Sequence, residues 1–379
     1  MTCAFPYNTS FTLQCLELIL LDLPQKEQFV SGIGKRTSRK TLIVKWQDKE
    51  GRIGYGECSC RPDPYYSSEF LDGVVLMIQK FIIPQLQSTQ TYNNVLTLLQ
   101  KIRGWNFAKS AIEAAAYQVL QQQTNHSLFD TLHTKPISKI PSGISMGIYT
   151  DKHEMKEAVE KNIAAGYRRL KFKISPNTDT DLFDFVNPLL FDSGSVISFD
   201  ANGSFSHKDL DKFAYFADTY NTVIEQPFSP SRFDIYLAAK ERFPNLQVCF
   251  DEEVKSMGDV IKLHQLGVLA ELNLKVGRVG GITNSIEILQ YCHQHQIPCW
   301  IGGMFETGIG RLLNLQFASY LPDAVAHDLS PSARYFIEDI IDPPVVMQKG
   351  YIDIVEAKKC EIIPELLQKF TIYQQEYKW

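Results

Sequence analysis

Charged residues end a series of short apolar runs in this chain, and the runs recur at a nearly constant spacing. Runs at 197–200, 223–225 and 248–251 each end on a carboxylate, and the run at 272–275 ends on a lysine. The charged ends lie 25, 26 and 24 residues apart, about one strand plus one helix. Strands that alternate with helices predict a parallel sheet. A closed barrel of such units gathers the carboxyl ends of its strands, where active sites lie.

The strand and helix rhythm begins near residue 142 and is lost after Arg334. Seven helices fit between the predicted strands, and the segment at 345–354 is predicted to be a hairpin that returns to the first domain. The eight predicted barrel strands lie near 143–148, 169–174, 196–200, 222–225, 247–250, 270–274, 298–302 and 325–327.

The part of the chain before the barrel has a different pattern. Residues 10–60 alternate like antiparallel strands, at 11–23, 41–46 and 53–58, with a turn at 48–51. Residues 67–123 have helical periodicity, and 108–120 is the clearest amphipathic segment. Between the first two strands, residues 29–38 contain Gly, Ser and basic residues. We expect this segment to be a mobile loop that closes over a site.

Composition favours a small-molecule enzyme. The 379 residues are 44% hydrophobic and 21% charged, as in ordinary soluble proteins. A net charge of −5 gives no basic field for nucleic acid or anionic lipid, so neither is an expected partner. The apolar stretch at 13–23 is interrupted by Gln14 and Glu17, so we expect a strand there and not a signal peptide. The stretch at 74–86 contains polar residues and is too short to span a bilayer. We therefore expect a cytoplasmic protein, and whether it forms a homo-oligomer is left open.

The charged strand ends suit a divalent metal ion. Asp200, Glu225 and Asp251 offer hard oxygen ligands, which fit octahedral Mg²⁺ and lack the His or Cys that zinc favours. We expect Mg²⁺ as the cofactor, with Mn²⁺ as a substitute. Lys171 and Lys173 alternate on one strand and would both point into the barrel mouth, which is costly without anions or a function. Solvated lysines at an exposed strand edge are the alternative.

Several motifs together resemble the enolase superfamily, specifically its muconate-lactonizing-like subgroup and the o-succinylbenzoate synthase and N-succinylamino acid racemase family. The resemblance covers nearly the whole chain. Its motifs are Gly54-Tyr55-Gly56-Glu57, Lys171-x-Lys173, Asp200-Ala201-Asn202-Gly203, Glu225-Gln226-Pro227, Asp251-Glu252, Lys275 with Gly277, and 302–308, which reads Gly-Gly-Met-Phe-Glu-Thr-Gly.

The resemblance implies a modified (β/α)₇β barrel of the TIM type under an α+β capping domain. We expect residues 1–133 to form the cap, 140–335 the barrel, and 336–379 a segment that returns to the cap, with 340–379 completing it. A small carboxylate is the implied substrate.

The resemblance also implies roles for individual residues. Mg²⁺ is held by Asp200, Glu225 and Asp251, and catalytic Lys173 and Lys275 flank the substrate from opposite faces. Electrostatic support comes from Lys171, Asn202 and Glu252. The expected substrate contacts are Gly302, Gly303, Met304, Phe29 and Ser31.

The favoured activity is o-succinylbenzoate synthesis, a Mg²⁺-assisted elimination of water in menaquinone biosynthesis. Removal of a proton α to a carboxylate leaves an enediolate, and a divalent cation stabilises its charge. Racemisation of N-succinylamino acids with the same residues is the second hypothesis. A metal-independent Schiff-base lyase that uses Lys275 is the third, since barrels also host that chemistry. A catalytically inactive binding barrel is the fourth.

Overall fold

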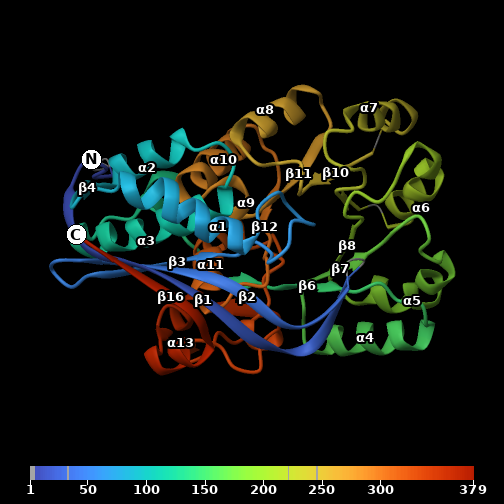
Figure 1. The fold of residues 1–379 in the computed structure, drawn as a ribbon. Helices are drawn as coiled ribbons and strands as arrows, with labels where there is room; N and C mark the ends of the chain where they lie inside the picture. The colour runs from blue at the N-terminus through green and yellow to red at the C-terminus, as the bar shows by residue number, and fades with distance from the viewer. Residues whose placement is uncertain (1–4, 32–33, 221, 245) are drawn as a thin grey trace.

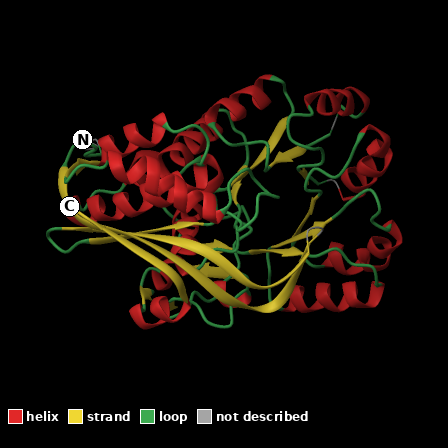
Figure 2. Cartoon of the chain, viewed as in Figure 1, coloured by secondary structure: helices red, strands yellow, loops and turns green. Residues whose placement is uncertain are grey.

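The computed structural model describes residues 5–31, 34–220, 222–244 and 246–379. An antiparallel sheet built from both ends of the chain lies beside a curled parallel sheet, as Figure 1 shows. Helices lie on the outer side of the parallel sheet (Figure 2). This is a modified barrel of the TIM type with an α+β cap, so the predicted fold class is confirmed.

The cap is an antiparallel sheet with the strand order β16-β1-β2-β3. Helix α3 packs on β3 and β2 and confirms the helix predicted at 108–120. That segment is buried on nearly all sides, so its predicted amphipathic character is wrong. The elements of the cap are β1 (Ser10–Ser31), β2 (Gly34–Asp48), β3 (Ile53–Cys58), β4 (Thr89–Thr91), β16 (Thr371–Lys378), α1 (Leu71–Met77), α2 (Tyr92–Lys101) and α3 (Asn106–Thr124).

Two glycines allow α3 to approach β3 at backbone contact. A Cβ at Gly56 would lie 1.9 Å from the carbonyl oxygen of Ala111, and one at Gly54 would lie 2.0 Å from that of Ala115. Gly54 and Gly56 are alternate residues, so both face the helix. The Gly-x-Gly of the cap motif therefore has a packing function.

The prediction of a loop at 29–38 is wrong, because the described residues of this segment continue the hairpin of β1 and β2. β1 and β2 pair as far as Ser31 and Gly34, with Phe29 opposite Arg36. The ladder joins backbone groups, so a polar stretch can extend it without an apolar face. Gly32 and Ile33 lie outside the described residues, as do the side chains of Phe29 and Ser31.

Seven parallel strands form the barrel sheet, in the order β12-β11-β10-β9-β8-β7-β6. They are β6 (Gly143–Met146), β7 (Arg169–Lys173), β8 (Val196–Asp200), β9 (Ile224–Glu225), β10 (Val248–Phe250), β11 (Leu269–Leu274) and β12 (Cys299–Ile301). The helices that connect and follow them are α4 (Lys152–Ala164), α5 (Thr180–Asp192), α6 (Leu210–Tyr220), α7 (Phe233–Arg242), α8 (Met257–Gln265), α9 (Val276–Val279), α10 (Ile282–Gln294) and α11 (Gly308–Ser319).

The eighth strand predicted at 325–327 is reduced to two single bridges. His327 pairs with Ser142 and Asp328 pairs with Gly302, both in parallel. Val325 donates its N–H to the carbonyl of Pro322, and this turn keeps the first predicted strand residue out of the ladder. The segment therefore links the two ends of the barrel sheet with very few residues.

The hairpin predicted at 345–354 does not return to the cap sheet. Its strand β14 (Tyr351–Asp353) pairs with β5 (Lys139–Pro141), next to the barrel. The strand that reaches the cap is β16, which lies beside β1. The remaining elements are β13 (Ile341–Asp342), β15 (Glu361–Ile362), α12 (Ile354–Ala357) and α13 (Pro364–Phe370).

Candidate active site at the carboxyl ends of the barrel strands

Three carboxylates lie in a row at the carboxyl ends of neighbouring barrel strands. Asp200 ends β8, Glu225 ends β9 and Asp251 follows β10. Asp200 is in register with Glu225, and Glu225 is in register with Cys249, two residues before Asp251. All three are buried. The structure thus brings together the three residues that the sequence spacing singled out.

Two lysines stand at opposite ends of this carboxylate row. Lys173 ends β7, and its Nζ lies 3.2 Å from Asp200 Oδ2. Lys275 follows β11, and its Nζ lies 2.8 Å from Asp251 Oδ2. Because β8, β9 and β10 lie between β7 and β11 in the sheet, the lysines flank the carboxylates from two sides.

Lys171 lies deeper in the barrel than Lys173 and is almost completely buried. Its Nζ lies 2.8 Å from Glu225 Oε2 and 2.9 Å from Asp328 Oδ2. Burial opposes its charge, but Asp328, Glu225 and Asp200 together raise the pKa of Lys171 above its ordinary value. Lys171 therefore remains a cation that holds carboxylates in place, and the solvated strand edge is excluded.

The lysines also act on Asp200. Burial alone would favour its neutral form, but Lys173, Lys171 and Lys275 lower the pKa of Asp200 to about 2. The backbone N–H of Asn202 donates to its Oδ1 at 3.0 Å. Asp200 is thus an anion at neutral pH.

Asn202 connects Lys173 to Glu252. Its Oδ1 accepts a hydrogen bond from Lys173, and its Nδ2 donates to Glu252 Oε1 at 3.0 Å. The backbone of Asn202 is left-handed, with φ of 44°, so the chain turns sharply after β8. Burial and the charge of Asp200 raise the pKa of Glu252 above its ordinary value. Asn202 therefore links the Lys173 end of the row to Glu252, which follows Asp251 and also acts on the charge of Lys275.

Tyr66 and Arg278 belong to the site, although the sequence pattern did not single them out. Tyr66 OH accepts from Lys275 Nζ at 3.0 Å and from Arg278 Nη1 at 3.2 Å. Arg278 also forms an ion pair with Asp251 and donates to the carbonyl of Asn273 at 2.7 Å. The spacing of Arg278, three residues after Lys275 on α9, could have indicated it. Tyr66 lies in an irregular segment with no such signal.

The glycine loop after β12 offers less free backbone than expected. The N–H of Gly302 donates to the carbonyl of Leu274 at 3.0 Å, and that of Met304 donates to Glu306 at 2.7 Å. Within the described part of the chain, the amide of Gly303 has no such partner. A free amide can receive a substrate oxygen, and the substrate contact expected from Gly303 stays a prediction. The substrate contacts expected from Phe29 and Ser31 stay predictions.

Glu57 of the cap holds the first turn of α11 in the barrel. It accepts from Thr307 N at 3.1 Å, Thr307 Oγ1 at 2.7 Å and Gly310 N at 2.9 Å. These contacts satisfy amides that a helix start leaves free. Burial and the neighbouring Glu306 raise the pKa of Glu57 to about 6. The last residue of the cap motif therefore fixes the cap against the loop of the site.

The family model described as "Enolase C-terminal domain-like" matches residues 154–358, more than half of the chain. The chain belongs to the enolase superfamily. The motifs at Lys171, Asp200, Glu225, Asp251 and Lys275 lie in or beside the carboxylate row, whereas Gly54-Tyr55-Gly56-Glu57 lies on β3 of the cap.

Relatives and solved structures of this superfamily match the chain almost from end to end. An o-succinylbenzoate synthase of Enterococcus faecalis is 31% identical over 91% of this chain and 94% of its own. An N-succinylamino acid racemase of an Amycolatopsis species is 30% identical over 95% of this chain and 97% of its own. A crystal structure of an enolase superfamily member from Enterococcus faecalis has a TM-score of 0.88 and 29% identity, over 97% of this chain and 100% of its own. The chain is thus an enzyme of the superfamily.

The carboxylate row offers a set of hard oxygen donors of the kind that Mg²⁺ prefers. Asp200, Glu225 and Asp251 are all-oxygen donors on consecutive strands. Their oxygens face lysines, and they do not form a group with every ligand atom within 4.8 Å of the others. Among the residues that the structure describes, only Cys15, Glu17 and Glu376 form such a group, on the cap sheet. The donor set fits Mg²⁺, and binding would require Asp200 and Asp251 to turn from Lys173 and Lys275.

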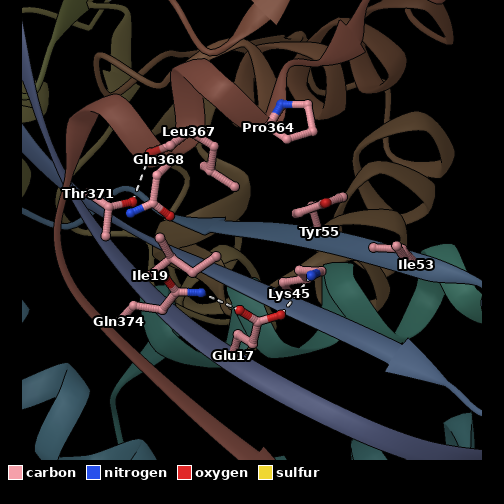
Figure 3. A pocket seen from close by; sticks show the side chains of 10 residues that line it. All are labelled: Glu17, Ile19, Lys45, Ile53, Tyr55, Pro364, Leu367, Gln368, Thr371 and Gln374. Atoms are coloured by element: carbon pink, nitrogen blue, oxygen red, sulfur yellow. Dashed lines mark hydrogen bonds and ion pairs between the residues drawn. The ribbon is translucent and has the colours of Figure 1, made fainter.

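A separate cleft of about 290 Å³ lies on the cap, between the sheet and α13 (Figure 3). Three of its polar side chains are paired with one another, since Glu17 accepts from Lys45 at 2.6 Å and from Gln374 at 2.5 Å. It contains none of the residues of the carboxylate row. The lining residues are Glu17, Ile19, Lys45, Ile53, Tyr55, Pro364, Leu367, Gln368, Thr371 and Gln374.

None of the helices in the described ranges has the length and apolar character of a membrane span.

Proposed function

We propose that the protein is a Mg²⁺-dependent o-succinylbenzoate synthase. It removes water from 2-succinyl-6-hydroxy-2,4-cyclohexadiene-1-carboxylate in menaquinone biosynthesis. The observation that carries the proposal is the row of three buried carboxylates with a lysine at each end. Relatives named o-succinylbenzoate synthase at about 30% identity support this substrate.

Lys173 is the proposed base. It is half-buried, with 30% of its side chain exposed, so a substrate can reach its Nζ. Asn202 and Asp200 hold this nitrogen at the edge of the row. To act as a base, Lys173 must leave its ion pair with Asp200 and lose its proton. In a syn elimination, the neutral amine of Lys173 then takes the α-proton as the C–H bond breaks. It then returns a proton to the hydroxyl, which leaves as water when the C–O bond breaks.

Lys275 acts as a fixed cation on the other side. Burial opposes its charge, but Tyr66, Glu252 and Glu225 raise the pKa of Lys275 above its ordinary value. An ammonium that stays protonated can stabilise the negative charge of an enediolate and contact the face of the ring.

Asp200, Glu225 and Asp251 would hold the metal ion. Mg²⁺ bound there supplies positive charge to the substrate carboxylate as negative charge develops on it. Lys171 and Asn273 orient Glu225 from both sides, at 2.8 Å and 2.7 Å. These two side chains therefore fix the middle ligand before the metal ion binds.

Racemisation of N-succinylamino acids is the second candidate. The same flanking geometry supports it, because each lysine can remove the α-proton from one of the two enantiomers. The racemase relative from Amycolatopsis is as similar as the synthases. The Schiff-base lyase is disfavoured, since it needs a neutral Lys275 and the environment of Lys275 favours the ammonium.

Metal removal tests the proposal. EDTA should abolish dehydration, and Mg²⁺ or Mn²⁺ should restore it. Asp200→Asn, Glu225→Gln and Asp251→Asn should each lose most of the activity, at least about 100-fold. Borohydride added with substrate should leave Lys275 unlabelled. Labelling of Lys275 together with full activity in EDTA would instead establish the lyase.

A further inference from the structure

Arg39 of β2 is a buried cation that contacts two segments at the mouth of the barrel. Its Nη2 donates to the carbonyl oxygens of Ser59 at 2.6 Å, Cys60 at 3.2 Å and Met304 at 3.1 Å. Only 7% of Arg39 is exposed. A buried guanidinium is costly unless its donors are bonded, so these contacts stabilise its position.

The first segment that Arg39 contacts leads to the Lys275 end of the site. Residues 59–70 have no regular secondary structure and contain Tyr66. The hydroxyl of Tyr66 lies 3.0 Å from Lys275 Nζ and 3.5 Å from Asp251 Oδ2. Without a ladder of its own, this segment depends on side-chain contacts such as those of Arg39 for its position.

The second segment is the glycine loop after β12. Met304 follows Gly303, whose amide has no backbone partner among the residues that the structure describes. The N–H of Met304 is held by Glu306 and its carbonyl by Arg39, so the peptide is fixed from both sides. One guanidinium thus joins a cap segment to a barrel loop on the two sides of the same opening.

We propose that Arg39 is a positioning residue that fixes residues 59–66 and 302–304 against each other and so sets the walls of the substrate site. The identity of the substrate rests on the proposed function. The walls meet the part of the substrate that does not react. Loss of Arg39 therefore affects KM and the choice between substrates more than it affects Mg²⁺ affinity.

Arginine suits this position better than lysine does. All three contacts start at Nη2, which the longer, planar side chain of arginine carries to the carbonyl oxygens, whereas the ammonium of lysine ends nearer to the backbone and is a compact, strongly hydrated point charge. Arg39→Lys therefore keeps the charge and loses part of the contact set, and Arg39→Met loses both. Lys40→Met is the matched control, because Lys40 is the next residue of β2, is exposed and carries the same charge.

The test measures steady-state kinetics with both substrates, Mg²⁺ affinity and hydrogen exchange. For Arg39→Met, KM should rise about 10- to 100-fold, with a smaller change in kcat. The ratio of dehydration to racemisation should also shift. Arg39→Lys should lie between wild type and Arg39→Met. Amides in 59–66 and 302–306 should exchange faster in both variants than in wild type or Lys40→Met.

Unchanged KM, substrate ratio and exchange in Arg39→Lys would overturn the proposal, even where Arg39→Met fails to fold. A lower melting temperature with wild-type KM and ratio would show a merely structural role and overturn it as well. If the wild type processes neither substrate, the proposed function fails. Hydrogen exchange in the two segments then still decides whether Arg39 positions them.

Discussion

At the residue scale, each carboxylate of the row has its own cation. Asp200 pairs with Lys173, Glu225 with Lys171 and Asp251 with Lys275. Removal of one partner of a buried pair leaves an uncompensated charge, which costs about 3–5 kcal/mol. A lysine variant in this site therefore changes both stability and chemistry. Its kinetics should be compared with those of a second variant that keeps the positive charge.

The two lysines should respond differently to substitution. Lys173→Ala should abolish dehydration, by at least about 100-fold, because it removes the base that moves both protons. Lys275→Arg keeps a cation and should retain more activity than Lys275→Ala. Single-turnover measurements at saturating Mg²⁺ separate chemistry from product release. Equal losses in Lys275→Arg and Lys275→Ala would show that Lys275 transfers a proton.

At the scale of elements, the joint between α3 and β3 depends on the absence of two side chains. Gly56→Ala would place a Cβ 1.9 Å from the carbonyl of Ala111, so the helix must move. We expect a loss of about 1–3 kcal/mol or more in the free energy of unfolding.

Gly147→Ala is the control for this packing, since no atom lies within 4 Å of a Cβ there and its φ is not positive. It should change the free energy of unfolding by less than about 0.5 kcal/mol. Urea titrations of both variants make the comparison. Equal, small effects at Gly56 and Gly147 would contradict the close approach of α3.

The joint between the cap and α11 should depend on pH through Glu57. Its pKa is raised from 4.5 to about 6 in the folded protein, so the unfolded chain ionises first as pH rises. The contribution of Glu57 is fully present below pH 4.5 and is lost as pH rises through 6. The loss is about 2 kcal/mol.

Glu57→Gln removes this titration. Between pH 4.5 and pH 7, the free energy of unfolding of Glu57→Gln should therefore rise by about 2 kcal/mol relative to wild type. Urea unfolding of both proteins across this range measures the difference. A difference that is constant with pH would mean that Glu57 ionises normally in the fold.

At the scale of the whole molecule, the sequence predicted what repeats along the chain. The regular spacing of about one strand plus one helix correctly placed Asp200, Glu225, Asp251 and Lys275 at strand ends. A parallel barrel brings the carboxyl ends of its strands to the same face. The helix α3 followed from its periodicity in the same way. Local patterns were sufficient wherever local structure fixed the position.

Contacts between distant segments could not be predicted in this way. Tyr66 reaches Lys275 across 209 residues, and Lys171 meets Asp328 across the bridged end of the barrel. The prediction of an eighth strand was wrong because two single bridges can form without the residue pattern of a strand. The prediction of a loop at 29–38 was wrong because backbone pairing does not require a recognisable side-chain pattern in a polar stretch. The predicted domain limits and the roles of the site residues stay predictions.

The central claim is that this site removes an α-proton between two lysines and expels water. The direct measurement offers both substrates to the wild type in D₂O with Mg²⁺. It records product absorbance for dehydration and α-deuterium for the N-succinylamino acids. We predict a kcat/KM for dehydration above that for racemisation, with both lost in EDTA. Racemisation well above dehydration, or turnover that survives EDTA, would contradict the account.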